Sequence, residues 1–82
     1  MKIRKANVYN GNDLITNVYL YENKKQEYSM IAIPELEWST TVQYEEDREM
    51  LKSRLIQSLS KRASANTSDE LAGKMIHWVG EM

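Results

Sequence analysis

Apolar and polar residues alternate along the first half of the chain, as they do in strands that bury one face. The alternation falls into four segments, which are Lys2 to Tyr9, Ile15 to Glu22, Tyr28 to Ile33 and Leu36 to Tyr44. Polar, turn-forming residues separate the first three segments. Pro34 separates the third from the fourth, because proline cannot donate a hydrogen bond to a sheet ladder. The pattern predicts about four strands in an antiparallel meander.

The second half has apolar residues at helical spacing instead. One predicted helix begins near Glu45, where a run of acidic residues suits the positive end of a helix dipole. A second begins at Thr67, because Thr67 to Glu70 has the spacing of a capping box ahead of an apolar run. The apolar stripes of the two helices comprise Leu51, Leu55, Leu59, Leu71, Met75, Ile76 and Val79.

This order of elements predicts an α+β protein of one domain, residues 1–82, with a β-meander over 1–44 and a helical pair over 45–82. Neither helix can bury its stripe alone, so both are expected to pack on one face of the sheet. The strand residues expected to meet them are Val18, Leu20, Ile31 and Ile33.

The second and third strands form the hairpin with the most aromatic side chains. A four-residue loop from Asn23 to Gln26 would place Tyr21 opposite Tyr28. It would also place Tyr19 opposite Met30. A shift of this register would still leave both faces of the hairpin rich in apolar side chains.

Only one face of this hairpin can be covered by the two helices. The other face would present Tyr19, Tyr21, Tyr28 and Met30. Tyrosine and methionine are residue types favoured at protein interfaces. The alternative is that these rings only shield a small sheet. Trp38 has two interpretations as well, because it is either a core residue or a partner-binding anchor beside the acidic segment, Glu35 to Glu49. These five residues are the candidate partner-binding site.

Composition narrows the function classes. The chain of 82 residues has no cysteine and a net charge of −1. A secreted domain this small would usually need disulfides, so we expect a cytoplasmic protein. The longest apolar run, Met30 to Ile33, is too short to cross a membrane. Positive charge is not concentrated anywhere, so a nucleic-acid partner is not expected.

Catalytic constellations are not found in the sequence. His77 is the only histidine, and the glycines are too scattered for a phosphate-binding loop. The acidic residues from Glu45 to Glu49 would point in different directions around a helix, which favours capping and solvation over metal binding. We therefore expect no enzyme activity, no cofactor and no metal site.

Three strings of residues resemble a known family. They are Ile3 to Asn7, Tyr21 to Lys25, and Ile33 to Thr40, and they are similar to segments of the YueH-like proteins of Bacillus and its relatives. The resemblance covers the whole chain and its length. It implies no catalytic or binding residues.

A second, partial resemblance is to the core of HicB-type antitoxins. The segment from Ile33 to Leu36, between two predicted strands and ahead of an acidic helix start, is similar to the turn of that family. Glu37 and Trp38 stand where that family usually has Pro-Gly. A second helix also replaces its usual final strand and DNA-binding module, which puts a toxin-neutralising function in doubt.

Three functional hypotheses follow. The first is a protein-interaction module, with another protein or a second copy as partner, using the tyrosine-bearing face or an exposed sheet edge. The second is a single-stranded RNA binder that stacks bases on Tyr19, Tyr21 and Tyr28 beside Lys24 and Lys25. The third is a HicB-like inhibitor that presents its acidic segment to a basic toxin. The arrangement of charge around the tyrosines distinguishes them.

Overall fold

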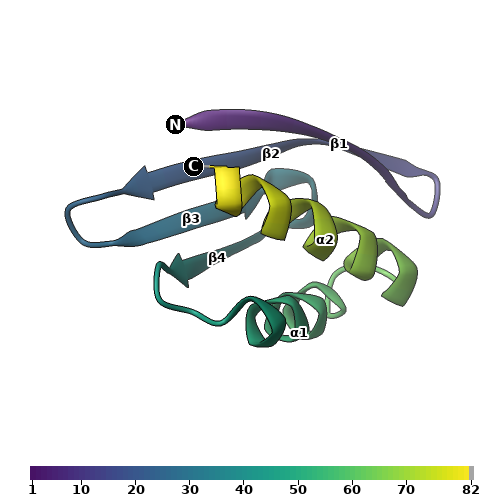
Figure 1. Cartoon of the computed structure of the whole chain (residues 1–82). Helices are drawn as coiled ribbons and strands as arrows, with labels where there is room; N and C mark the ends of the chain where they lie inside the picture. Colours follow the sequence, from purple (N-terminus) through teal and green to yellow (C-terminus); the bar gives the residue numbers. More distant parts are fainter. Residues whose placement is uncertain (82) are drawn as a thin grey trace.

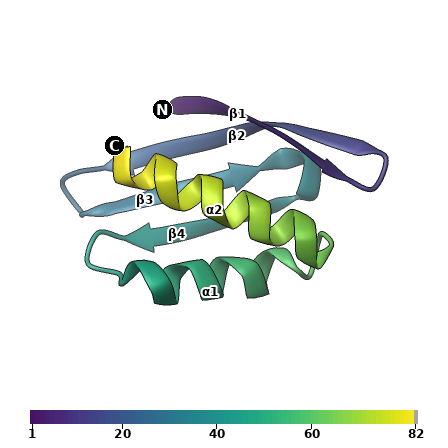
Figure 2. The ribbon, with the colours of Figure 1, turned by 45° about the vertical axis from the view of Figure 1, so that its right-hand side comes forward.

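The computed structural model describes residues 1–81, which form four strands and two helices (Figure 1). The elements in chain order are β1 (Lys2–Asn10), β2 (Asp13–Asn23), β3 (Tyr28–Ile33), the 3-10 turn η1 (Pro34–Leu36), β4 (Trp38–Gln43), α1 (Arg48–Leu59) and α2 (Ala65–Glu81). The strands form one sheet in the order β1-β2-β3-β4, and every pair is antiparallel. Both helices lie on the same side of this sheet (Figures 1 and 2). The predicted α+β meander followed by two helices is confirmed.

The register of the central hairpin differs from the predicted one. Tyr21 lies opposite Met30, and Tyr19 lies opposite Ala32. The predicted pairs of Tyr21 with Tyr28 and Tyr19 with Met30 are therefore wrong by two residues. Side chains alternate between faces with a period of two, so this shift leaves every side chain on its predicted face.

The turn between β2 and β3 explains the shift. The Asn23 side-chain oxygen accepts a hydrogen bond from the Gln26 amide at 3.0 Å, so Asn23 ends the strand while still paired with Tyr28. Glu27 has a φ of 58°, in the left-handed region, and completes the turn. The four loop residues are consequently 24–27 rather than 23–26.

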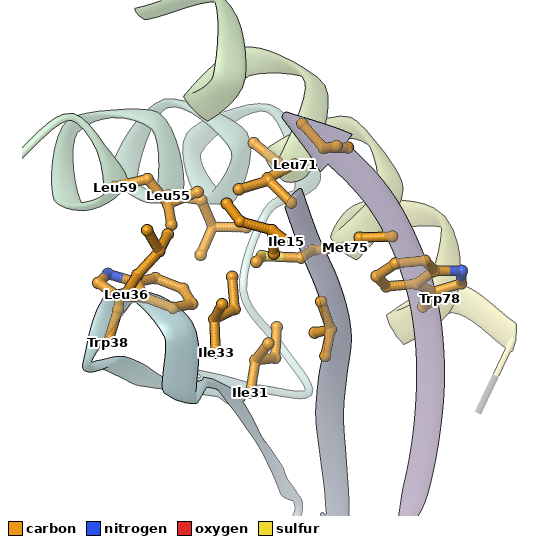
Figure 3. Packing of buried hydrophobic residues seen from close by; sticks show 14 of the residues in the cluster. Ile15, Ile31, Ile33, Leu36, Trp38, Leu55, Leu59, Leu71, Met75 and Trp78 are labelled. Atoms are coloured by element: carbon orange, nitrogen blue, oxygen red, sulfur yellow. The ribbon is translucent and has the colours of Figure 1, made fainter. Parts of the chain in front are cut away.

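The core lies between the sheet and the helices (Figure 3). Leu55 and Leu59 of α1 lie near Leu36 and Trp38 at one end of this layer, and Met75 lies farther along it. The predicted core residues that are buried are Val18, Leu20, Ile31, Ile33, Leu51, Leu55, Leu59, Leu71 and Met75. Two others, Ile76 and Val79, pack against the core but are only partly buried.

The helix starts differ from the predicted ones because other residues cap them. Helix α1 begins at Arg48, where the Asp47 carboxylate accepts a hydrogen bond from the Met50 amide at 3.0 Å. Helix α2 begins at Ala65, two residues before the predicted Thr67. The Ser64 hydroxyl accepts from the Thr67 amide at 3.2 Å, so Ser64 takes the capping position.

Thr67 has a different role, in holding α2 against β1. Its side chain is buried, and its hydroxyl donates to the Tyr9 carbonyl at 2.8 Å. The Ser64 amide also donates to the Asn10 side-chain oxygen at 3.4 Å. These two bonds fasten the start of α2 to the end of β1.

The capping assignment yields a stability prediction. Ser64→Ala removes the acceptor for the Thr67 amide and is expected to lower the free energy of unfolding by roughly 0.5–2 kcal/mol. Urea denaturation followed by circular dichroism measures the change. Ser53→Ala, at an exposed position within α1, is the matched control and should leave stability nearly unchanged. An equal effect of the two substitutions would contradict Ser64 as the cap.

Candidate functional site

The side of the sheet that faces away from the helices carries the predicted tyrosines. Leu20 of β2 and its partner Ile31 of β3 are fully buried against the helices. The alternation along each strand therefore turns Tyr19, Tyr21 and Met30 to the opposite side. We call this side, over β2, β3 and β4, the tyrosine face. Its side chains are Tyr19, Tyr21, Asn23, Tyr28, Met30, Ala32, Ser39, Thr41 and Gln43.

The centre of the tyrosine face is aromatic and open to solvent. Tyr21 is 38 % exposed, and its cross-strand partner Met30 is 41 % exposed. The rings of Tyr21 and Tyr28 are tilted by 60° with centroids 6.4 Å apart, within the range of a favourable aromatic pair. On the neighbouring strand β1, Ile3 lies opposite Tyr19 and is exposed too. The structure thus brings together four of the five candidate residues.

None of the nine side chains of the tyrosine face is charged. This is unusual for a chain in which 28 % of residues are charged. On the neighbouring strand β1, the Lys5 ammonium group donates to the Asn17 side-chain oxygen at 2.8 Å. The face is therefore an apolar and aromatic centre with an uncharged polar margin on β4.

Trp38, the fifth candidate, lies elsewhere. It is only 7 % exposed and belongs to the core (Figure 3). Its indole N–H donates to the Ser58 hydroxyl of α1 at 2.8 Å, which satisfies the one polar atom of the ring. The structure therefore places Trp38 on the helix side of the sheet, away from the tyrosine face.

Arg54 of α1 lies along the β4 edge of the sheet. Its guanidinium forms two hydrogen bonds to the Glu46 carboxylate, at 2.8 and 3.1 Å. It also donates to the Thr40 hydroxyl and the Thr41 carbonyl, both at 3.0 Å. The Arg54 pairing holds the pKa of Glu46 below its usual value. One side chain thus ties α1, β4 and the loop between them together.

The acidic segment is partly engaged in the fold. The Glu35 carboxylate accepts a hydrogen bond from the Thr16 amide at 3.0 Å, which lowers the pKa of Glu35. Glu46 pairs with Arg54, and Asp47 caps α1. Glu37, Glu45 and Glu49 are exposed.

Sequence reasoning missed the polar β4 residues of the tyrosine face, and also Ile3, which borders this face on β1. The sequence pattern was sufficient to find them, because β1 and β4 both alternate and their outward positions follow from the buried neighbours. The missing information was the register between neighbouring strands. The observed register supplies it by setting Ile3 beside Tyr19 and Thr41 beside Met30.

The fold and this surface define a small α+β protein with helices on one side of a meander and an uncharged aromatic face on the other. Comparison with known proteins places the chain in a family. The model of the YueH-like proteins matches residues 2–81, so the chain belongs to this family. A Bacillus subtilis (strain 168) relative named "Uncharacterized protein YueH" is 50 % identical over 82 residues, which cover 100 % of both chains. The resemblance expected from the sequence is confirmed.

No solved structure matches the chain. Within residues 1–81, neither helix is long and apolar enough to cross a membrane. The same residues contain no group of three or more histidine, cysteine, aspartate or glutamate side chains arranged to hold a metal ion.

Proposed function

We propose that this protein acts through protein–protein interaction rather than catalysis, and that its tyrosine face joins two copies into a homodimer. The observation that carries the proposal is an exposed aromatic sheet face without a charged side chain. Exposed groups of aromatic and apolar side chains rimmed by polar residues often mark protein–protein interaction sites. The absence of cysteine is compatible with the cytoplasm, which we propose as the compartment.

Charge favours a second copy as the partner. In a two-fold symmetric dimer the same patch meets itself, so a charge near the symmetry axis would meet its own copy. The tyrosine face avoids this repulsion because none of its nine side chains is charged. Tyrosine and methionine also contribute large contact areas, and tyrosine is enriched among the residues that dominate binding energy.

The size of the face suits a dimer as well. Stable complexes commonly bury about 800 Å² on each partner. That area is roughly 15 % of the 5265 Å² of accessible surface of this chain, which one side of a two-layer protein can provide. Two sheets stacked through such faces would lie about 10 Å apart, with Tyr21 and Met30 near the centre of the contact.

The two other hypotheses have less support. An RNA-binding face needs cations around its aromatic rings. Here Lys5 lies at one margin, and Lys24 and Lys25 lie in the hairpin loop at one end. A toxin inhibitor needs a free acidic segment, whereas Glu35 and Glu46 are engaged within this chain.

The decisive experiment introduces a charge at the centre of the face. Met30→Lys sets two like charges against each other in the dimer and should weaken self-association by about 30-fold or more, equivalent to about 2 kcal/mol. Met50→Lys is the matched control, because Met50 is 71 % exposed on α1, away from the tyrosine face. Sedimentation equilibrium of the parent protein and both variants measures the association constants, and circular dichroism checks their folding.

A parent protein that stays monomeric at about 100 μM would contradict the homodimer. Equal association of the Met30→Lys and Met50→Lys proteins would show that another surface is used. Binding of oligo(U) that weakens steeply with added salt would favour the RNA hypothesis instead.

A further inference from the structure

A cavity lies on the other side of the sheet, at the end where the last turn of α2 meets β2, β3 and the start of α1. Its volume is about 220 Å³, and its walls include Ser29, Arg48 and Gly80. Figures 1 and 2 show the C-terminal end of α2 and the connection from β4 to α1 at the same end of the molecule as the β2–β3 hairpin. The cavity is separated from the tyrosine face by the sheet itself.

The wall formed by β3 carries the hydroxyl group of Ser29. Ser29 is only 2 % exposed as a residue and lines the cavity. The hydrogen bonds within residues 1–81 include none from its hydroxyl, which is therefore available to a molecule in the cavity.

Two opposite charges line the same cavity. Glu22 of β2 and Arg48 of α1 both contribute to its walls, yet they form no ion pair with each other. Arg48 makes no ion pair with any other of residues 1–81 either. Its guanidinium lies against the last turn of α2, 3.9 Å from the position that a Cβ atom would take at Gly80.

Glu22 is held in place by Tyr44. The Tyr44 hydroxyl donates to one carboxylate oxygen of Glu22. This bond raises the pKa of Tyr44 to about 12. A carboxylate has about four acceptor sites, so Glu22 can still accept from a bound molecule.

We propose that this cavity binds a small zwitterion of the amino-acid type, with its carboxylate on Arg48 and its ammonium group on Glu22. The Ser29 hydroxyl completes the hydrogen bonding of the bound molecule. A volume of about 220 Å³ suits a small solute such as a free amino acid better than a nucleotide. A guanidinium pairs with a carboxylate through two parallel bonds, which gives this end of the site its orientation.

Nuclear magnetic resonance tests the assignment. Each standard amino acid is titrated into the ¹⁵N-labelled full chain at up to about 10 mM, a concentration that detects millimolar affinity. At least one should cause saturable shifts of the backbone amides of Ser29, Tyr44 and Gly80. Acetate and methylammonium, which carry the two charges separately, should each bind at least about tenfold more weakly.

Variants separate the site from general surface effects. Arg48→Gln should weaken binding about tenfold or more, whereas Arg62→Gln, at an exposed arginine beyond the end of α1, should leave it unchanged. Ser29→Ala should also weaken binding. It should not lower the melting temperature of the free protein, because it removes a hydroxyl without a partner among residues 1–81.

Three results would overturn the proposal. They are the absence of saturable shifts with every amino acid, equal binding to the Arg48→Gln and parent proteins, and acetate binding as tightly as any amino acid. None of them bears on self-association, which is measured through Met30 on the other side of the sheet.

Discussion

Replacing Trp38 by alanine is expected to lower the free energy of unfolding by about 3–5 kcal/mol. The side chain is 7 % exposed, and its removal leaves a cavity between β4 and α1. It also leaves the Ser58 hydroxyl without its donor. A domain of this size has only a few kcal/mol of net stability, so much of the protein should be unfolded at 37 °C. Urea denaturation at 10 °C measures the loss.

Two further variants divide this effect into its causes. Trp38→Phe keeps most of the volume and should cost less, with about 1 kcal/mol from the lost bond to Ser58. Tyr9→Ala removes an aromatic ring that is 65 % exposed and should have a small effect. A Trp38→Ala protein as stable as Tyr9→Ala would show that Trp38 is not a core residue.

Leu55→Ala is expected to cost about 2–5 kcal/mol for a related reason. Leu55 is fully buried in the middle of α1, where it lies among Leu36, Trp38 and Leu59 (Figure 3). Alanine has the higher helix propensity, so the helix itself is not weakened and the loss reports packing alone. Thermal and urea unfolding provide the measurement.

The control for this substitution lies on the same helix. Met50→Ala truncates an apolar side chain that is 71 % exposed, so it should change stability by less than about 0.5 kcal/mol. If Leu55→Ala and Met50→Ala unfold at the same urea concentration, Leu55 does not anchor α1 on the sheet.

The faces of the sheet were predictable from the sequence, whereas the register was not. Alternation places Leu20 and Tyr21 on opposite sides of the sheet whatever the turn. A slip of one residue in the pairing of the strands would exchange the two faces, so the buried face excludes it. A slip of two residues preserves them, so alternation cannot distinguish Tyr21 opposite Tyr28 from Tyr21 opposite Met30. The turn decides between them through the bond from the Gln26 amide to Asn23 and the left-handed backbone of Glu27.

Helix starts were less predictable, because several residues near each start are able to cap. Ser64 and Thr67 both precede apolar runs, and either hydroxyl could accept from a first-turn amide. Tertiary contact decides, since Thr67 instead donates to the Tyr9 carbonyl of β1. No local pattern indicates a partner 58 residues away.

The two candidate sites also differ in how well the sequence alone predicts which residues they contain. Tyr19, Tyr21, Tyr28 and Met30 come from one hairpin, so its alternation was enough to group them. The cavity instead gathers Glu22, Ser29, Tyr44, Arg48 and Gly80 from five separate parts of the chain. The β2–β3 pairing sets Glu22 beside Ser29, whereas Tyr44, Arg48 and Gly80 join them only through the packing of the later elements on the sheet.

The hydrogen bonds of Arg54 at the β4 edge affect whether further copies of the chain can extend the sheet. A sheet grows without limit when a free edge strand accepts another strand by hydrogen bonding. At β4 the Thr41 carbonyl is already bonded to Arg54. At the other edge, β1 has cationic residues at positions 2, 4 and 5 and a bulge at Asn7, where φ is 54°. Lysines and bulges on an edge oppose strand addition. Both edges of the sheet therefore disfavour edge-to-edge growth into fibrils, so the proposed dimer would not be extended through them.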